Sequence, residues 1–396
     1  MRVLQINNLC GRGSTGKIAV GISKLSDDNG IENTIFYFSR KSPYPNSTKI
    51  TNRFSLKIQA LKSRILGNYG FNSNRITNKL IKKIDEYNPD IVHIHNIHGH
   101  NANIEVLFEY LKATKKKVVY TFHDCWAFTG YCPHFSLIRC EKWKTKCFCC
   151  PLRKKYSWFI DKSDDNFERK KRAILGTNMV IVTPSFWLRD ITRESFLNIF
   201  PIKVINNGID LNVFHPQNSS FRKDYELENK KIILGVADIW SKQKGLDVFI
   251  ELSKKMPAEY KVVLVGTSKK IDKKLPSSIL SIHRTQNQKE LAGIYSSADV
   301  FVNATREDSF PTVNMESLAC GTPVLTFRTG GSPEIIDDAC GSVVECDDID
   351  SLISEIIRIC TLNPYSKESC LNKAKNFNAN DRFKEYIDLY KTFFED

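Results

Sequence analysis

The sequence lacks several features that would place it in a familiar class of protein. It has no uninterrupted apolar run approaching the length of a membrane-spanning helix, which argues against a transmembrane protein. Its first residues form a short strand pattern that is too polar at its flanks for a signal peptide. No DNA- or RNA-binding motif is present. We therefore expect a cytoplasmic globular protein that does not bind nucleic acid.

Acidic residues are in deficit. Lys and Arg number 58 against 44 Asp and Glu, which gives a formal net charge of +14. This excess favours anionic partners, either phosphate-bearing substrates or the anionic inner face of the cell membrane, although most charged runs are only solvated faces. The basic residues crowd into two stretches of the first half: Arg53, Lys57, Lys62, Arg64, Arg75, Lys79, Lys82 and Lys83, then Lys142, Lys144, Lys146, Arg153, Lys154, Lys155, Arg169, Lys170, Lys171 and Arg172.

The length and the order of strand-like and helix-like segments predict two α/β domains. A chain of 396 residues exceeds one compact domain of ordinary size. Strand and helix patterns alternate in both halves, which is typical of doubly wound parallel sheets. We predict a first domain at residues 1–212, a linker at 213–230, a second domain at 231–378, and a C-terminal helix at 379–396 that crosses back to the first domain.

A glycine-rich loop follows the first predicted strand. Residues 11–17 match most of a phosphate-binding loop of the form G-x4-G-K. Ile18 stands where a P-loop NTPase needs a Ser or Thr hydroxyl for magnesium. A P-loop NTPase is therefore the weaker alternative, although Gly13 and Gly16 still permit close approach to a phosphate.

Histidines gather near two predicted strand ends. His93 and His95 alternate along a strand and point to one face, which favours structural roles in the core. His123 ends another strand, where functional groups collect in this architecture. We therefore predict a functional role for His123, as a group that could stabilise developing charge on a ligand.

Cysteines concentrate in one loop, residues 125–150, although a cytoplasmic chain argues against disulfides. Cys132, Cys140, Cys147 and Cys150 could together form a closed thiolate site for a structural zinc ion. The alternative is a set of reduced, partly buried thiols. Both interpretations stay open.

Two acids flank a predicted helix start in the second half. Asp308 and Glu316 follow a buried strand at residues 299–303, and Pro311 between them suits the first turn of a helix. Ligands bind at this edge of α/β sheets, and helix N-termini attract phosphate. The alternative is that Asp308 and Ser309 only cap the helix.

The segment at residues 305–324 resembles the E-x7-E signature of retaining glycosyltransferases of family four. Asp308 occupies the first-acid position with Glu307 beside it, and Glu316 occupies the second. Further resemblances follow in order along the chain: G-S-T-G-K-I at 13–18, T-x-H-D at 121–124, V-I-x-N-G-I-D at 204–210, K-G at 244–245 and G-G-x-P-E at 330–334. The pattern around the cysteine-rich loop is similar to the subgroup that builds bacterial surface polysaccharides.

The resemblance implies a GT-B fold, two Rossmann-like domains facing across a cleft. It implies a retaining, metal-independent glycosyltransferase that uses a UDP- or GDP-sugar and a glycan or lipid-linked acceptor. Its reaction groups would be His123, Lys244 and either Asp308 or Glu307. Its donor-binding residues would be Gly13, Gly16, Lys242, Lys244, Ser309, Phe310, Pro311, Thr312 and Glu316, with Glu316 on the ribose.

One departure from the family pattern keeps a second class open. The family places an arginine ahead of the diphosphate-binding lysine, but this chain has none there, and Lys242 is the candidate substitute. A non-catalytic protein that binds a nucleotide-sugar is therefore the alternative to the enzyme.

Overall fold

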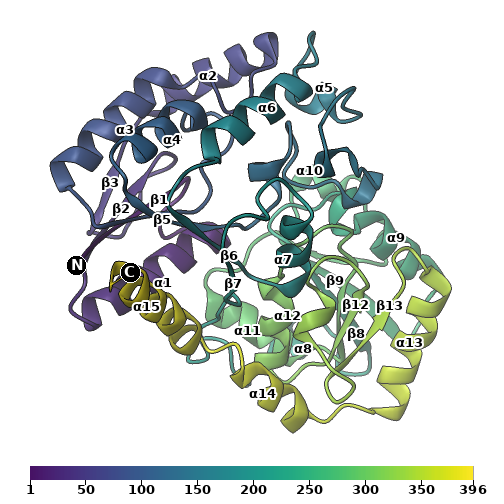
Figure 1. Ribbon diagram of the computed structural model, residues 1–396. Helices are drawn as coiled ribbons and strands as arrows, with labels where there is room; N and C mark the ends of the chain where they lie inside the picture. The colour runs from purple at the N-terminus through teal and green to yellow at the C-terminus, as the bar shows by residue number, and fades with distance from the viewer. Residues whose placement is uncertain (396) are drawn as a thin grey trace. The chain divides into compact units, whose positions relative to one another are not determined.

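The computed structural model describes residues 1–395 and divides into two compact units (Figure 1). The first unit contains Met1–Asn206 and the segment from Asn380 onward, and the second contains Asn207–Ala379. Each unit is a parallel β-sheet with helices around it. The prediction of two doubly wound α/β domains is therefore confirmed.

The sheet of the first unit has seven parallel strands in the order β3-β2-β1-β4-β5-β6-β7. The chain winds outward from β1 in one direction and then in the other, so the strand order reverses between β1 and β4. The strands are β1 (Arg2–Asn7), β2 (Glu32–Tyr37), β3 (Ser47–Lys49), β4 (Ile91–Ile94), β5 (Lys117–Thr121), β6 (Met179–Thr183) and β7 (Ile202–Val204). The helices are α1 (Gly13–Asp28), α2 (Arg53–Leu66), α3 (Asn74–Tyr87), α4 (Ile104–Ala113), α5 (Arg153–Tyr156), α6 (Ser163–Ile174), α7 (Phe186–Arg193) and α15 (Ala379–Glu395).

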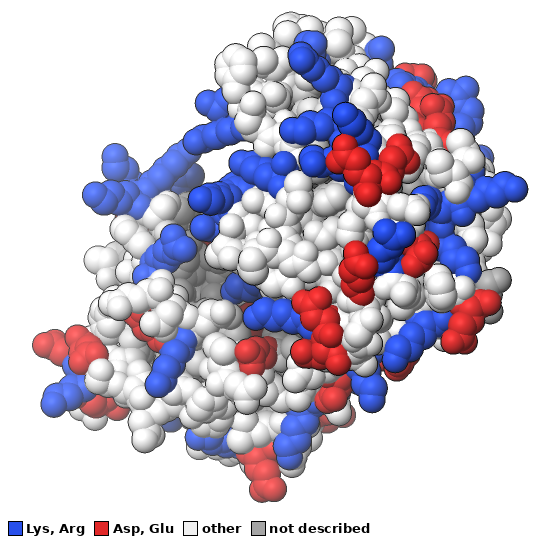
Figure 2. All heavy atoms as spheres, turned by 90° about the vertical axis from the view of Figure 1, so that its left-hand side faces the viewer, with Lys and Arg blue, Asp and Glu red and all other residues white. Residues whose placement is uncertain are grey.

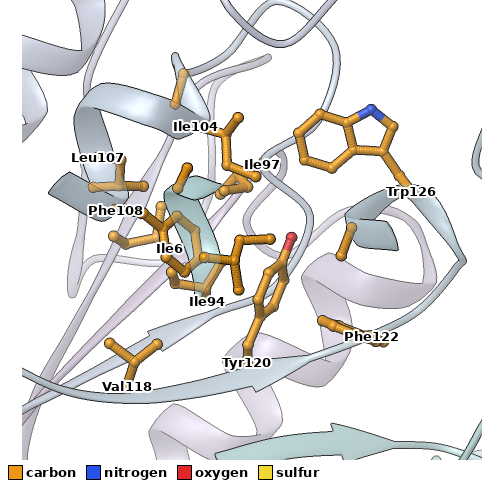
Figure 3. Packing of buried hydrophobic residues seen from close by; sticks show 14 of the residues in the cluster. Ile6, Ile94, Ile97, Ile104, Leu107, Phe108, Val118, Tyr120, Phe122 and Trp126 are labelled. Carbon is orange, nitrogen blue, oxygen red and sulfur yellow. The ribbon is translucent and has the colours of Figure 1, made fainter. Parts of the chain in front are cut away.

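The core of the first unit forms where apolar strands meet the inner face of α4. Figure 3 shows Ile94 and Val118, from neighbouring strands, near Leu107 and Phe108 of α4. All four side chains are fully buried. Full burial of an aliphatic or aromatic side chain contributes roughly 1.5–3 kcal/mol. These side chains therefore hold α4 against β4 and β5.

The cysteine-rich loop adds to the same core. It contains three short 3-10 helices, η1 (Trp126–Phe128), η2 (Ser136–Ile138) and η3 (Lys142–Lys144). Phe135 stacks on Trp143 with ring centroids 4.8 Å apart, and Phe128 packs beside them. The loop is thus held by buried aromatic side chains, whatever the state of its thiols.

The sheet of the second unit has six parallel strands in the order β10-β9-β8-β11-β12-β13. Its strand order reverses between β8 and β11. The strands are β8 (Lys231–Val236), β9 (Tyr260–Val265), β10 (Leu280–Ile282), β11 (Val300–Asn303), β12 (Val324–Phe327) and β13 (Gly341–Val344). Around them lie α8 (Phe221–Asp224), η4 (Lys242–Lys244), α9 (Leu246–Lys255), α10 (Lys269–Asp272), α11 (Gln288–Ser296), α12 (Thr312–Ala319), η5 (Pro333–Ile335), α13 (Ile349–Leu362) and α14 (Lys367–Lys375).

The segment predicted as a linker, residues 213–230, lies within the second unit. Phe214, Phe221 and Leu227 are buried in that unit's core. Arg222 also binds Asp299, at the start of β11. The three apolar residues are spaced without a helical or strand period, so the sequence pattern did not reveal that they anchor the segment.

The C-terminal helix α15 belongs to the first unit from Asn380 onward. Tyr386 and Tyr390 on α15 are buried against His93 of β4. Phe383 lies so close to Gly21 of α1 that a β-carbon on Gly21 would come within 2.2 Å of its ring. The absence of a side chain at Gly21 therefore lets α15 pack closely against α1.

Across residues 1–395, no helix combines the length and the apolar character needed to cross a membrane.

Candidate active site

The loops after β8 and β11 bring predicted donor-site residues of the second unit together. These strands flank the point where the strand order reverses, which is where such sheets bind ligands. The Lys244 ammonium lies 2.7 Å from Oδ2 of Asp308, and both side chains stay partly exposed. The lysine predicted to bind the diphosphate and a predicted first-position acid thus form one ion pair.

Two glycines permit the close approach of these loops. Gly245, at the start of α9, has φ +74°, and a β-carbon there would lie 2.4 Å from the carbonyl oxygen of Ala304. Gly330 has φ +55°, and a β-carbon there would lie 1.8 Å from the carbonyl oxygen of Asp308. A larger residue at either position would push the Lys244 or Asp308 loop out of place.

Arg306 fixes the same loops, and the sequence did not indicate this role. Its guanidinium is buried and donates to both Asp247 oxygens at 2.8 and 3.0 Å. It also donates to Asp347 at 2.7 Å and to the backbone carbonyl of Lys242. Arg306 therefore ties the β11 loop to η4 and α9, while the Lys242 side chain is exposed.

Ser309 carries a buried hydroxyl that has no hydrogen-bond partner in residues 1–395. An unpartnered buried polar group costs about 1–3 kcal/mol, so a ligand that bonds to it would recover that cost. Phe310 beside it is buried, and its carbonyl accepts a bond from Asn207 at 3.1 Å. Pro311 precedes α12, which begins at Thr312, within one residue of the predicted start.

Glu316 lies one turn into α12 and is half-buried. The Tyr295 hydroxyl donates to its Oε2 at 3.2 Å. Burial, followed by the charge of Glu316, raises the pKa of Tyr295 well above its usual value. Tyr295 therefore stays protonated and holds the carboxylate in one orientation.

Glu307, the other first-position candidate, is 8% exposed. Its backbone carbonyl accepts a bond from the Thr305 hydroxyl at 3.3 Å. The Asp308 side chain, by contrast, is 24% exposed and contacts Lys244. This geometry favours Asp308 as the acid that meets a ligand.

Histidines occupy the corresponding edge of the first unit. The Gln5 amide donates to the Ala19 carbonyl, so its Oε1 faces His95 Nε2 at 2.9 Å. That nitrogen must carry the hydrogen, which leaves His95 Nδ1 to accept from His123 Nε2 at 3.1 Å. The chain of bonds fixes the His123 ring and leaves its Nδ1 as an acceptor.

The electrostatics of this edge keep the histidines neutral. Burial lowers the pKa of His93 to about 3 and that of His123 to about 4. Burial also lowers the pKa of His95 well below its usual value. Burial opposes ionisation of Asp124 as well, but His98, 2.9 Å away, and the Trp126 amide hold its pKa at about 2. The predicted structural roles of His93 and His95 agree with their burial and bonding.

The glycine-rich loop turns tightly between β1 and α1. Gly13 has φ +64° and opens α1, while the Gly11 amide donates to the Gly16 carbonyl at 3.0 Å. A β-carbon on Gly16 would lie 3.1 Å from the Leu9 carbonyl oxygen. Both predicted glycines thus shape the loop, and Lys17 is exposed.

The four thiols predicted to bind zinc line one loop. Cys132 is buried and the other three, Cys140, Cys147 and Cys150, are partly buried. The Gly130 amide donates to Cys147 Sγ at 3.2 Å. In residues 1–395, no group of three or more His, Cys, Asp or Glu side chains is arranged to hold a metal ion. Structural zinc stays a prediction, which elemental analysis of the purified protein would test.

Lys170 departs from the expectation of a solvated basic face. It is fully buried, and its Nζ donates to the Trp126 and Thr129 carbonyls at 2.6 and 2.7 Å. The ammonium also lies 3.6 Å from the Trp126 ring centroid. Lys170 therefore anchors the cysteine-rich loop to α6.

The fold and the comparison with protein families together identify a glycosyltransferase of the GT-B class. The model "Glycosyltransferase Family 4" matches residues 21–213, and "Glycosyl transferases group 1" matches residues 230–361. The chain belongs to the family-four glycosyltransferases, as its motifs predict.

Individual relatives extend over the whole chain. The colanic acid biosynthesis glycosyl transferase WcaC of Escherichia coli (strain K12) is 22% identical over 99% of this chain and 100% of its own. Sucrose-phosphate synthase from Thermosynechococcus elongatus superposes with a TM-score of 0.72 at 15% identity, over 100% of this chain and 99% of its own. Anabaena HepE in complex with UDP-glucose gives a TM-score of 0.71 at 14% identity, over 99% and 100%. These structures confirm the GT-B fold.

Proposed function

We propose that this glycosyltransferase is a retaining enzyme of surface polysaccharide biosynthesis, moving a sugar from a nucleoside diphosphate to a glycan or lipid-linked acceptor. The Lys244–Asp308 pair beside the unpartnered Ser309 hydroxyl carries the proposal. The similarity to WcaC supports the pathway, and the HepE complexes with UDP and UDP-glucose support the donor class.

In this proposal the second unit binds the donor. Glu316, oriented by Tyr295, accepts hydrogen bonds from the ribose hydroxyls. Lys244 contacts the diphosphate, with Lys242 as a second cation. Asp308, or Glu307 in its place, contacts the sugar hydroxyls, while Ser309, Phe310 and Thr312 line the passage from sugar to phosphate. Pro311 has no amide hydrogen to contribute there.

The transfer step follows from these contacts. The bond from the anomeric carbon to the diphosphate oxygen breaks, and its electron pair stays with the diphosphate. The acceptor oxygen attacks from the same face, and its proton passes to the leaving phosphate oxygen, so the configuration is retained. Lys244 offsets the charge that builds up on the diphosphate. We also propose that no divalent metal is needed, so chelation with EDTA would leave the rate unchanged.

The first unit would serve the acceptor side. His123, held by His95 through Nε2, presents its backbone and its Nδ1 at the strand end. A neutral histidine there can orient a hydroxyl without repelling a cationic transition state. Gly13 and Gly16 would let the first loop approach a phosphate group of a substrate closely.

A transfer assay with purified protein tests the proposal. A panel of UDP- and GDP-sugars is first screened for a rise in unfolding temperature, since a ligand that binds only the folded state stabilises it. The stabilising donor is then incubated with lipid-linked acceptors. Stabilisation without transfer or hydrolysis would favour the non-catalytic binding protein, whereas magnesium-dependent ATP or GTP turnover would favour the P-loop NTPase.

A further inference from the structure

One long stretch of the first unit contains no acidic residue. Residues 33–84 include no Asp or Glu, although Glu32 and Asp85 bound the stretch on either side. Figure 2 shows basic side chains close together in the upper left of one face, with no acidic side chains between them. The basic residues of the stretch are Arg40, Lys41, Lys49, Arg53, Lys57, Lys62, Arg64, Arg75, Lys79, Lys82 and Lys83.

Within this stretch α2 turns its large apolar side chains outward. Phe54, Ile58, Leu61 and Ile65 recur at helical spacing and are 72%, 38%, 51% and 41% exposed. The inner face carries Leu56, which is partly buried against the core, together with smaller or polar residues, and Ser63 is the only fully buried residue of the helix among those described. A helix that only covered a core would show the reverse pattern.

A second exposed apolar segment extends the outer face of α2. The Trp158 amide donates to the Arg64 carbonyl at 2.7 Å, and the Arg64 guanidinium lies 5.9 Å from the Trp158 ring centroid. Trp158, Phe159 and Ile160 are 49%, 67% and 47% exposed. An exposed tryptophan next to apolar and basic side chains is typical of a surface that meets the membrane–water interface.

A cationic cavity opens at the beginning of α2. It has a volume of about 490 Å³, and three of its lining residues, Arg40, Lys49 and Arg53, are exposed bases. No ion pair joins any of the three to a carboxylate in residues 1–395. Phe38, Ser39 and Leu56 also line the cavity, so it offers unpaired positive charge beside apolar side chains.

We propose that α2 and residues 158–160 dock the first unit on an anionic bilayer, with a lipid phosphate in the cavity of Arg40, Lys49 and Arg53. The apolar stripe would enter the boundary between headgroups and acyl chains, while Lys57 and Lys62 remain among the headgroups. Charge complementarity selects the occupant, since each basic residue near an anionic surface adds about 1 kcal/mol. The surface lies entirely within one unit and does not rest on the proposed reaction.

Co-sedimentation of the full chain with vesicles tests this surface. The wild type is expected to pellet with phosphatidylcholine–phosphatidylglycerol vesicles and to stay in solution with phosphatidylcholine alone. Ile58→Asn with Leu61→Asn, and separately Arg40→Gln with Lys49→Gln, are each expected to weaken binding about tenfold or more. All four positions are exposed, so far-UV circular dichroism and the unfolding temperature should not change.

Matched controls come from the second unit. Ile239→Asn with Leu362→Asn removes apolar side chains that are more exposed than Ile58 and Leu61, and Lys254→Gln with Lys289→Gln removes the same charge. Both should bind like the wild type. Equal binding by the α2 variants, no binding to anionic vesicles, or a dimer in gel filtration that the α2 variants break would overturn the proposal. Stabilisation by inorganic phosphate without vesicle binding would also overturn it.

Discussion

The two units place different chemistry at the same topological position. Each has a parallel sheet whose strand order reverses once, and each gathers polar side chains at that edge. In the first unit the edge holds His95 and the half-buried His123, next to the buried His93 of β4, and desolvation keeps all three neutral. In the second unit it holds the ion pair of Lys244 with Asp308.

The strand order thus determines where polar side chains gather in each unit, and the residues of the strand-end loops determine which charges they carry there. A neutral edge suits an acceptor hydroxyl, which carries no charge before the reaction. An edge that holds a lysine suits a diphosphate, which gains negative charge as it leaves, because the ammonium can turn from Asp308 to the phosphate.

The largest effect is expected from Lys244→Ala. Loss of the cation beside the departing diphosphate should lower kcat about 10²- to 10³-fold, because the contact strengthens as charge develops. The Lys244–Asp308 pair is partly exposed, so the unfolding temperature should change little. Steady-state kinetics would measure the effect, with Lys254→Ala as the surface control. An unchanged kcat would remove Lys244 from the mechanism.

Arg306→Leu should separate positioning from chemistry in the second unit. It removes the shared partner of Asp247 and Asp347, but both carboxylates are about half exposed (47% and 52%), so we expect a loss of only about 1–2 kcal/mol in the free energy of unfolding. Urea unfolding would measure this loss. Since Arg306 also fixes the Lys242 backbone, kcat should fall as well. Wild-type stability would show that the network does not hold the loops.

The neutral edge of the first unit should appear as a pH dependence of stability. The pKa of His93 is lowered from 6.5 to about 3, so between these values the unfolded chain binds more protons than the folded one. Above pH 6.5 the imidazole is neutral in both states and the pKa difference does not affect stability. Below pH 6.5 it lowers the free energy of unfolding, by about 2 kcal/mol at pH 5. His93→Gln, compared with wild type by urea unfolding at pH 7 and pH 5, should lose this part of the slope. Identical slopes would contradict the assignment.

The smallest effect is expected from Glu316→Gln. The amide oxygen can still accept from Tyr295, but the charge that strengthens bonds to the ribose is gone. The dissociation constant of the donor should rise about five- to tenfold, with a smaller change in kcat. Calorimetric titration would measure it. A larger effect on kcat than that of Lys244→Ala would reverse the roles assigned to the two residues.

Local sequence patterns predicted the architecture because most of the strands are short apolar runs and the loop motifs follow them closely. The run at residues 299–303 and the acids after it became β11 and the Asp308 loop. The position of residues 213–230 was not predictable in this way, because Phe214, Phe221 and Leu227 become informative only when the core they enter is known.

The sequence motifs named residues that the structure brings together, such as Lys244 and Asp308, but they did not reveal the residues that hold these in place. Arg306 meets partners 59 and 41 residues away in sequence, and no local pattern joins them. Gln5 orients His95 across 90 residues. Lys170 stands in a basic run that resembles a solvated face, yet the neighbouring loop buries it. Long-range contacts of single polar side chains leave no periodic trace in the sequence.

The central claim is that the second unit binds a nucleotide-sugar for a retaining transfer. The most direct measurement is the NMR spectrum of the product formed from a donor of known anomeric configuration, chosen by its stabilisation of the purified protein. The account predicts a glycoside with the configuration of the donor, formed by the wild type and largely lost in Lys244→Ala. A product of inverted configuration, or full activity in that variant, would contradict it.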